Sequence, residues 1–397
     1  MRNFSRMTKR WLNKGHEFDY IASLLMRKEN AFYLVGNSKE IKVFYDRVGR
    51  EINVDGRVKG VVLTEFHGNP LDEELEIVSD SDIPKDKNTI VICTSFDRGK
   101  YESVKQLFEN YGFEENRQFF QAELISMIFE VYIKDWISLD RVEIFMTSMC
   151  SLKCEKCIAY IPYFKEKTII PIETLKNDAD ILFEKVDYIR KYKVLGGEGL
   201  MYPQLSSFVE YVCSRYGAQI ESFRIGTNGT IIPSAELLDV CRKHNVILDI
   251  SDYTIKIGNV SKIEKVKQIC QEVGVNVDIK RTGEQWLDMG FPKKLPGEKN
   301  EMQLQKHFSN CAMFCRNFND GRLYYCCSNF AAVKAGLYPF NENDCFDFRR
   351  SFSKKELLEY EAGFSDRGYT TFCKVCRGCS DEVNPFHVEV AKQVERL

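Results

Sequence analysis

The sequence predicts an α/β protein whose main part is a parallel (β/α) barrel or part of one. Strand-like apolar segments alternate with helix-like segments five times between residues of about 138 and 285, which is typical of a parallel sheet covered by helices. A short polar motif follows each of these strands, and in parallel barrels that edge carries the active site. The 397 residues of the chain are enough for about two to three domains.

The repeated units follow from hydrophobic periodicity and from capping residues. Ser234 is placed to cap one helix, and Gly274 ends another. We expect strands over 142–146, 192–195, 223–225, 247–250 and 275–279, and helices over 172–189, 204–216, 234–244 and 263–273.

Residues 1–125 predict a separate, smaller α/β domain, with strands over 31–35, 60–64 and 89–94 and helices over 39–45 and 101–110. The turn Gly36-Asn37-Ser38 could open a phosphate site, but it lacks the further glycines of a dinucleotide fingerprint. A docking or scaffolding role is therefore favoured over a nucleotide site. The segment is similar to the Rossmann-like domains attached to some sugar-modifying enzymes.

Charge and hydropathy exclude several classes of protein. The 56 Lys and Arg residues against 58 Asp and Glu residues give a net charge of −2, whereas a duplex-DNA binder is usually far more basic. No apolar run approaches the roughly 20 residues that span a bilayer. Residues 1–14 are basic but lack the apolar core of a signal peptide. We therefore expect a cytoplasmic protein with no nucleic-acid or membrane partner.

Fifteen cysteines are the most unusual feature of the composition. Their odd number, tight clusters and the missing export signal argue against disulfides and for metal binding. Cys150, Cys154 and Cys157 lie on one short loop after the first barrel strand. Three thiolates there can hold three irons of a [4Fe–4S] cluster and leave the fourth open for a chelating small molecule. A zinc site is the alternative, although it would need a distant fourth ligand.

This loop and the motifs after the next strands resemble the radical S-adenosylmethionine (SAM) family. Gly196-Gly197-Glu198 resembles the motif that binds the amino group of SAM. The family's chemistry implies a partial (β/α)6 TIM-like barrel over 138–300, reductive cleavage of SAM to a 5′-deoxyadenosyl radical, and a low-potential electron donor such as flavodoxin or ferredoxin. The cofactor-binding residues implied by the resemblance are Gly196, Gly197, Glu198, Thr227, Asn228 and Ser251.

Two positions depart from the family pattern. The residue before the third cysteine is commonly an aromatic residue that touches adenine, and here it is Lys156. The position after the glutamate is commonly proline, and here it is Gly199.

Residues 301–397 carry two further groups of cysteines and resemble the SPASM and twitch extensions of the same family. The resemblance implies one auxiliary [4Fe–4S] cluster bound by Cys311, Cys326, Cys373 and Cys376. Cys315, Cys327 and Cys379 are spare or alternative ligands. Zinc is the alternative metal here as well, because CxxC pairs suit it.

Asp252, Tyr253 and Arg281 end barrel strands, where catalytic or substrate-binding groups are expected. The resulting hypothesis is an enzyme that abstracts hydrogen from a small polar metabolite, such as a sugar, aminocyclitol or nucleotide-sugar. The outcome would be dehydrogenation, epimerisation, deoxygenation or rearrangement. Two alternatives stay open: a peptide-modifying maturase, and a non-catalytic iron–sulfur electron-transfer or activator protein.

Overall fold

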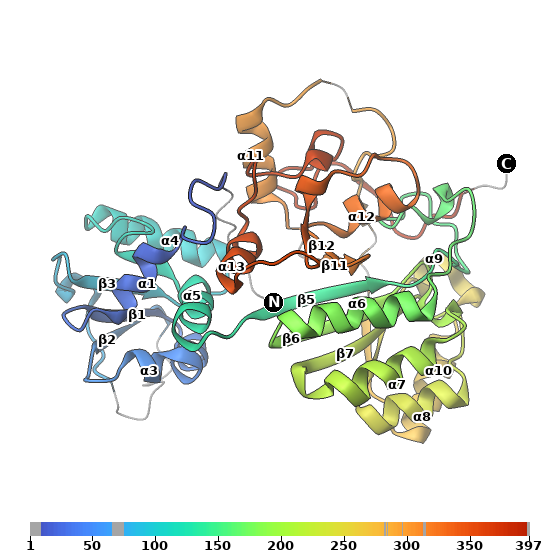
Figure 1. Cartoon of the computed structure of the whole chain (residues 1–397), viewed down its shortest axis with the longest axis horizontal. Helices are drawn as coiled ribbons and strands as arrows, with labels where there is room; N and C mark the ends of the chain where they lie inside the picture. Colours follow the sequence, from blue (N-terminus) through green and yellow to red (C-terminus); the bar gives the residue numbers. More distant parts are fainter. Residues whose placement is uncertain are drawn as a thin grey trace. The chain divides into compact units, whose positions relative to one another are not determined.

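The computed structural model describes residues 9–65, 75–281, 283, 285–295, 297–312 and 315–394. The chain forms two compact units (Figure 1). The first is built from Trp11–Ile137 and Ser353–Phe364, and the second from Ser138–Phe352 and the chain from Ser365 on. No helix of the described residues is long and apolar enough to cross a bilayer.

A four-stranded parallel sheet forms the centre of the first unit. Its order is β2-β1-β3-β4, with β1 Ala31–Gly36, β2 Val58–Leu63, β3 Thr89–Cys93 and β4 Phe119–Gln121. Strands β1 and β3 are buried almost throughout, as expected when helices cover both faces. The helices are α1 Asp19–Met26, α2 Ser38–Phe44, α3 Arg50–Ile52, α4 Arg98–Asn110, α5 Ala122–Lys134 and α13 Lys354–Ala362.

The turn after β1 is closed by its own residues. A Cβ atom on Gly36 would lie 2.0 Å from the hydroxyl oxygen of Thr94, so this glycine is required by packing within the unit. Asn37 caps α2 by accepting a hydrogen bond from the backbone N–H of Glu40 at 3.0 Å. These contacts favour the scaffolding interpretation of this domain over a phosphate site.

The extent of this unit differs from the sequence-based division at residue 125. Helix α5 continues through that boundary, and its residues Ala122–Val131 are all buried. Helix α13, which lies between the two C-terminal groups of cysteines in the sequence, packs against α5. Residues 301–397 therefore do not fold as one separate body.

An eight-stranded sheet forms the second unit, in the order β13-β12-β11-β5-β6-β7-β8-β9. The six strands from β11 to β9 are parallel, and β12 and β13 are added antiparallel. The strands are β5 Ser138–Phe145, β6 Tyr188–Leu195, β7 Ile220–Thr227, β8 Ile247–Asp252, β9 Val277–Arg281, β11 Arg316–Asn319, β12 Arg322–Tyr324 and β13 Cys345–Asp347; β10 Gln285–Leu287 and β14 His387–Glu389 form a separate antiparallel pair.

The four long helices that connect the five strands β5 to β9 lie along one side of this sheet (Figure 1). Right-handed crossovers between neighbouring parallel strands produce this arrangement. The helices of the second unit are α6 Ile172–Lys185, α7 Leu205–Tyr216, α8 Ala235–His244, α9 Thr254–Ile257, α10 Ile263–Val273, α11 Glu301–Asn310 and α12 Cys327–Lys334.

The predicted α/β class with a partial parallel barrel is confirmed, and two details differ. Helix α6 ends at Lys185, because Val186 is already extended and begins the approach to β6. The sixth parallel strand, β11, does not extend the sheet beyond β9. It returns to the opposite edge and pairs with β5.

Candidate functional site

The three-cysteine loop leaves the carboxyl end of β5 and packs against the end of β6. The backbone N–H of Gly197 donates to the carbonyl of Thr147 at 2.8 Å, and that of Glu198 donates to Met149 at 2.7 Å. A Cβ atom on Gly197 would lie 2.5 Å from the Met149 carbonyl oxygen and 2.8 Å from the Cβ of Cys150. The absence of a side chain at Gly197 is therefore what allows the loop to lie against the strand end, a reason that the sequence did not reveal.

The thiols of this loop are free and partly buried. Cys150 accepts a hydrogen bond from the backbone N–H of Leu152 at 3.4 Å and contacts the side-chain amide of Asn228 at 3.7 Å. Burial raises the pKa of Cys150 to about 12 and that of Cys154 to about 11. Metal binding at these positions would therefore displace protons.

The spacing of these thiols bears on which metal they fit. Zinc–sulfur bonds of about 2.3 Å bring the ligands of one ion to within roughly 4 Å of one another. Within the residues that the structure describes, a group of three ligand atoms less than 4.8 Å apart occurs only at Glu143, Cys315 and Cys327. The wider spacing of the loop thiols fits a cluster of several irons better than a single zinc ion.

A C-terminal segment, residues 390–394, covers the cysteine loop. The backbone N–H of Val394 donates to the carbonyl of Lys153 at 2.8 Å, and the side-chain oxygen of Gln393 accepts from the N–H of Lys153 at 2.7 Å. The side-chain amide of Gln393 also donates to the sulfur of Cys154 at 3.4 Å. Val390 is fully buried in this contact. Nothing in the sequence of this segment indicates that it covers the loop.

Glu198 lies behind the site rather than on its surface. Its side chain is 1% exposed, and its two oxygens accept hydrogen bonds from the backbone N–H groups of Leu200 at 3.0 Å and Asn228 at 2.7 Å. Burial raises the pKa of this carboxyl, although the two N–H groups oppose the rise. The Glu198 carboxylate therefore joins the ends of β6 and β7, and its contact with the amino group of SAM stays a prediction.

A cavity of about 600 Å³ opens in front of the loop. The three loop cysteines line it together with five of the six predicted cofactor residues, which are Gly196, Gly197, Thr227, Asn228 and Ser251. Tyr253 also lines it, with its ring edge-to-face against Trp286 at a centroid distance of 5.5 Å. Burial raises the pKa of Tyr253 to about 12, so its hydroxyl is neutral at pH 7.

The other two predicted catalytic residues do not line this cavity. Asp252 accepts a hydrogen bond from the backbone N–H of Thr254 at 2.9 Å and so begins the short helix α9. Arg281 is exposed at the end of β9. Asp252 and its register partner Arg281 thus lie outside the cavity lining, whereas Ser251 and Tyr253 on either side of Asp252 belong to it, and the contact of Asp252 and Arg281 with a substrate stays a prediction.

Four polar residues, here called the polar wall, also line the cavity and were not predicted. They are Arg141 and Glu143 from β5, Lys193 from β6 and Asn317 from β11. Lys193 pairs with the buried Asp249 at 2.9 Å. The available signal was charge at every second position of a buried strand, as at Arg141 and Glu143, because such residues point into the interior of a barrel.

The four predicted C-terminal ligands lie together in a part of the second unit rich in thiols. The backbone N–H of Cys379 donates to the sulfur of Cys311 at 3.3 Å, and that of Gly378 donates to the sulfur of Cys376 at 3.3 Å. The ammonium of Lys299 bonds the carbonyls of Cys373 and Cys376 at 3.0 and 2.7 Å. Backbone N–H donors to the sulfurs of Cys311 and Cys376 fit a cluster site in which Cys379 contributes its backbone.

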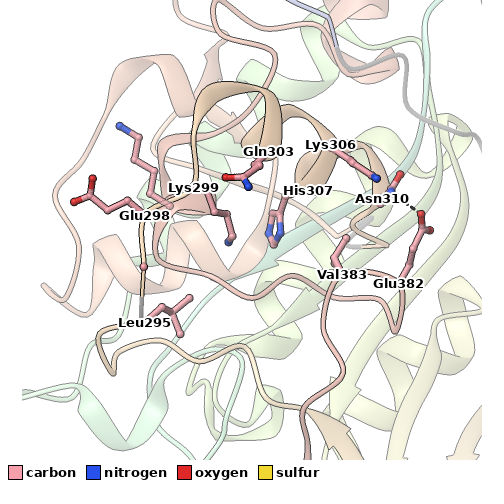
Figure 2. Close-up of a pocket in the computed structure, with 11 residues that line it drawn as sticks. Leu295, Glu298, Lys299, Gln303, Lys306, His307, Asn310, Glu382 and Val383 are labelled. Atoms are coloured by element: carbon pink, nitrogen blue, oxygen red, sulfur yellow. Dashed lines mark hydrogen bonds between the residues drawn. The ribbon is translucent and has the colours of Figure 1, made fainter.

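A second cavity, of about 470 Å³, lies beside these cysteines and is lined by Lys299, Lys306 and His307 (Figure 2). It contains none of the predicted site residues.

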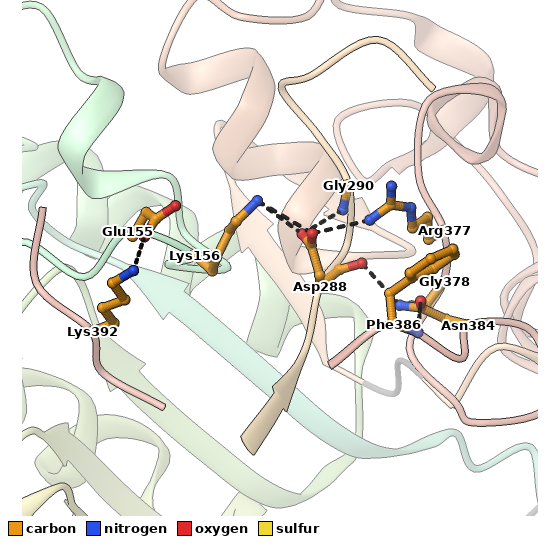
Figure 3. Close-up of polar contacts among 9 residues, drawn as sticks. All are labelled: Glu155, Lys156, Asp288, Gly290, Arg377, Gly378, Asn384, Phe386 and Lys392. Atoms are coloured by element: carbon orange, nitrogen blue, oxygen red, sulfur yellow. Dashed lines mark hydrogen bonds and ion pairs between the residues drawn. The ribbon is translucent and has the colours of Figure 1, made fainter. Parts of the chain in front are cut away.

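Lys156, which departs from the family pattern, takes part in an ion-pair network (Figure 3). Its ammonium lies 3.2 Å from the carboxylate of Asp288, which also accepts from Arg377 at 3.0 Å and from the backbone N–H of Gly290 at 3.0 Å. Burial opposes ionisation of Asp288, but Gly290 and Lys156 hold its pKa below the usual range. Lys156 thus joins the cysteine loop to the segment after β10.

No protein-family model matches the sequence, and no curated protein matches it. Solved structures do match. "Native anSMEcpe with bound AdoMet" is 13% identical over 61% of this chain and 89% of that chain, with a TM-score of 0.40. "Crystal structure of BtrN in complex with AdoMet and 2-DOIA" is 15% identical over 63% and 100%, with a TM-score of 0.37. "Crystal structure of Streptococcus suis SuiB bound to precursor peptide SuiA" is 15% identical over 46% of each chain, with a TM-score of 0.31. Similarity at this level leaves the function to the residues of the site.

Proposed function

We propose that this chain is a radical SAM enzyme that acts on a small polar metabolite in the cytoplasm. The observation that carries the proposal is the meeting of three elements at one cavity: the free thiols of Cys150, Cys154 and Cys157, the glycine end of β6, and Asn228 at the end of β7. Each comes from a different strand–helix unit, and the sequence alone placed them at the same edge of the sheet.

The three loop thiols would hold a [4Fe–4S] cluster, and the ends of β6 to β8 would hold SAM. Bound together, these groups supply a 5′-deoxyadenosyl radical that removes a hydrogen atom from the substrate. Gly196 and Gly197 present backbone at the cavity surface, where a side chain would obstruct both the loop and a ligand. Asn228 fixes the loop through Ser151 at 3.1 Å.

The polar wall supports a small polar substrate. Arg141, Glu143, Lys193 and Asn317 present both charges and an amide to the cavity. Because SAM must occupy part of the volume of about 600 Å³, the remainder suits a small molecule better than a folded partner. A sugar, aminocyclitol or nucleotide-sugar carries the hydroxyl and amino groups that such a wall would bind. Of the predicted catalytic residues, Tyr253 lines this cavity, and we expect it to contact the substrate.

A peptide-modifying activity is the second candidate. A single side chain of a peptide could enter the same cavity, and the polar wall does not exclude it. The two candidates share the initial radical step and differ in the substrate that accelerates it.

Cys311, Cys326, Cys373 and Cys376 would hold one auxiliary [4Fe–4S] cluster. With four thiolates it would have no open iron, so its proposed role is to accept an electron from the substrate radical or to stabilise the fold of this region.

The test is anaerobic reconstitution followed by mass spectrometry of 5′-deoxyadenosine, with dithionite or a flavodoxin or ferredoxin as reductant. We expect SAM cleavage in the wild type and none when Cys150, Cys154 and Cys157 are all replaced by Ala. The matched control is Cys213→Ala, which replaces a free cysteine on α7 and should cleave SAM as the wild type does. Cleavage that persists in the triple variant would overturn the assignment.

A metabolite panel and a peptide panel then separate the two substrate classes. We expect sugars or aminocyclitols to accelerate release of 5′-deoxyadenosine. Acceleration by peptides alone would favour the maturase. An iron–sulfur protein that never cleaves SAM would be an electron carrier.

A further inference from the structure

Two cysteines and a glutamate that the proposed clusters do not use lie together in the lining of the large cavity. Glu143 is on β5, Cys315 precedes β11, and Cys327 begins α12. Their ligand atoms all lie within 4.8 Å of one another. The backbone N–H of Cys327 donates to the carbonyl of Cys315 at 3.1 Å, which fixes the two residues relative to each other. All three line the cavity.

A second observation points to a ligand at the same place. Asn317 is the register partner of Glu143 in the β5–β11 pair and also lines the cavity. Its side chain is 2% exposed, and its amide oxygen has no hydrogen-bond partner among the described residues. A buried acceptor without a donor is costly, which is the usual sign of a bound water or ion that completes the site.

Charge also favours a bound cation. Two thiolates and a carboxylate carry three negative charges, and the Arg141 guanidinium paired with Glu143 offsets one of them. A divalent cation offsets the other two. In the structure the Cys327 thiol is hydrogen-bonded to that of Cys315, and ligation of a cation by both sulfurs would replace this contact.

We propose that Cys315, Cys327 and Glu143 bind one zinc ion whose open position faces the cavity. Two sulfurs with one carboxylate oxygen suit zinc, whereas Mg²⁺ and Ca²⁺ select oxygen ligands. Three protein ligands and one exchangeable position are the pattern of catalytic zinc sites. The unpartnered oxygen of Asn317 accepts a hydrogen bond from the water in that position, and a substrate oxygen can replace this water.

The zinc ligands are thiols that neither the SAM-cleaving site nor the auxiliary cluster uses. Cys315 and Cys327 pack in the same buried group as Cys311, Cys326 and Cys376, so the two sites are distinguished by their ligands and not by distance. Zinc binding can therefore be measured whether or not SAM is cleaved.

The test uses the reconstituted full chain and zinc alone. Anaerobic protein receives one equivalent of Zn²⁺, unbound metal is removed, and zinc and iron are measured by mass spectrometry. X-ray absorption spectroscopy at the zinc edge then identifies the ligand atoms and their distances from zinc. We expect one zinc per chain, about two sulfur ligands at roughly 2.3 Å with oxygen completing the shell, and about eight irons for two four-iron clusters.

Two double variants are compared. The test pair combines Cys315→Ser and Cys327→Ser, and the control pair combines Cys213→Ser and Cys345→Ser. The first pair should lower zinc affinity at least tenfold in competition with a chelator and leave the iron content unchanged. The control pair should change neither. The number of sulfur ligands on zinc is measured in the wild type, so this part of the test holds even if a variant fails to fold.

Four outcomes would overturn the site: no bound zinc, zinc with four sulfur ligands, iron near twelve per chain in the wild type, or loss of iron together with zinc in the Cys315/Cys327 pair. The last two would assign these cysteines to an iron–sulfur cluster instead.

Discussion

Replacing Gly197 by Ala should loosen the cysteine loop while leaving the rest of the fold in place. The added Cβ would lie 2.5 Å from the carbonyl oxygen of Met149 and 2.8 Å from the Cβ of Cys150, so the loop must move away by several tenths of an ångström. Overpacking of this kind costs about 1–3 kcal/mol. Loss of chain entropy in the unfolded state returns about 0.4–1 kcal/mol. With mid-range values of about 2 and about 0.7 kcal/mol for these two effects, the net destabilisation is about 1–2 kcal/mol.

Two assays measure this effect. Each kcal/mol lowers the Tm of a domain of this size by about 2–4 °C, so thermal unfolding should shift by about 2–8 °C. A cost of 1–2 kcal/mol on the closed loop also raises its open population by about 5–30-fold, and iron loss from reconstituted protein to a chelator should accelerate accordingly.

The matched control is Gly217→Ala, at a residue with helical backbone and nothing within 4 Å of the added Cβ. It should be neutral or slightly stabilising. If Gly197→Ala equals Gly217→Ala in both Tm and iron retention, then contact with the loop is not the reason for glycine at this position.

Three further changes test other parts of the site. Glu198→Gln should lower the free energy of unfolding by about 1–3 kcal/mol in a denaturant titration, because one backbone N–H loses its acceptor. The control Glu173→Gln, on an exposed turn of α6, should change this free energy little. Gln393→Ala should speed iron loss to a chelator. Lys392→Ala in the same segment removes only an exposed ion pair with Glu155 at 3.6 Å and should change the rate little, and equal rates would contradict the contact with Cys154. Burial lowers the pKa of His307 to about 4, so the unfolded chain takes up its proton first and stability falls by about 2 kcal/mol between pH 7 and pH 5. His307→Phe should remove this part of the pH dependence, and an unchanged slope would refute it.

The sequence predicted local structure best where a specific side chain decides it. Ser234 caps α8 through the N–H of Leu237 at 3.2 Å, and Gly274 ends α10 with a left-handed φ of 75°. Both follow from chemistry within one turn of the helix. The α5 helix was missed because no side-chain cap marks its start and because its polar residues Glu123 and Glu130 are buried as well, in ion pairs with Arg47 that the sequence does not show.

Non-local features were beyond the reach of sequence patterns. The pairing of β11 with β5 joins residues more than 170 positions apart, and it is this pairing that places Asn317 beside Glu143. Tyr253 lines the cavity and Asp252 does not, because adjacent residues of a strand point to opposite faces of the sheet. The sequence does not show which of the two faces meets the cavity. Positions after strands therefore predicted the edge of the sheet but not the individual side chains.

The segment that covers the cysteine loop also constrains the order in which the protein matures. Gln393 contacts Cys154 across 239 positions of the chain, so the ribosome makes the loop long before its cover exists. During that interval, the loop thiols are open to whatever delivers iron and sulfide. Once residues 390–394 have docked, Cys154 is covered on that side, and exchange is limited to the cavity that the three thiols line unless the segment detaches. Docking of this segment thus divides an early stage of cluster delivery from a later stage of cluster retention.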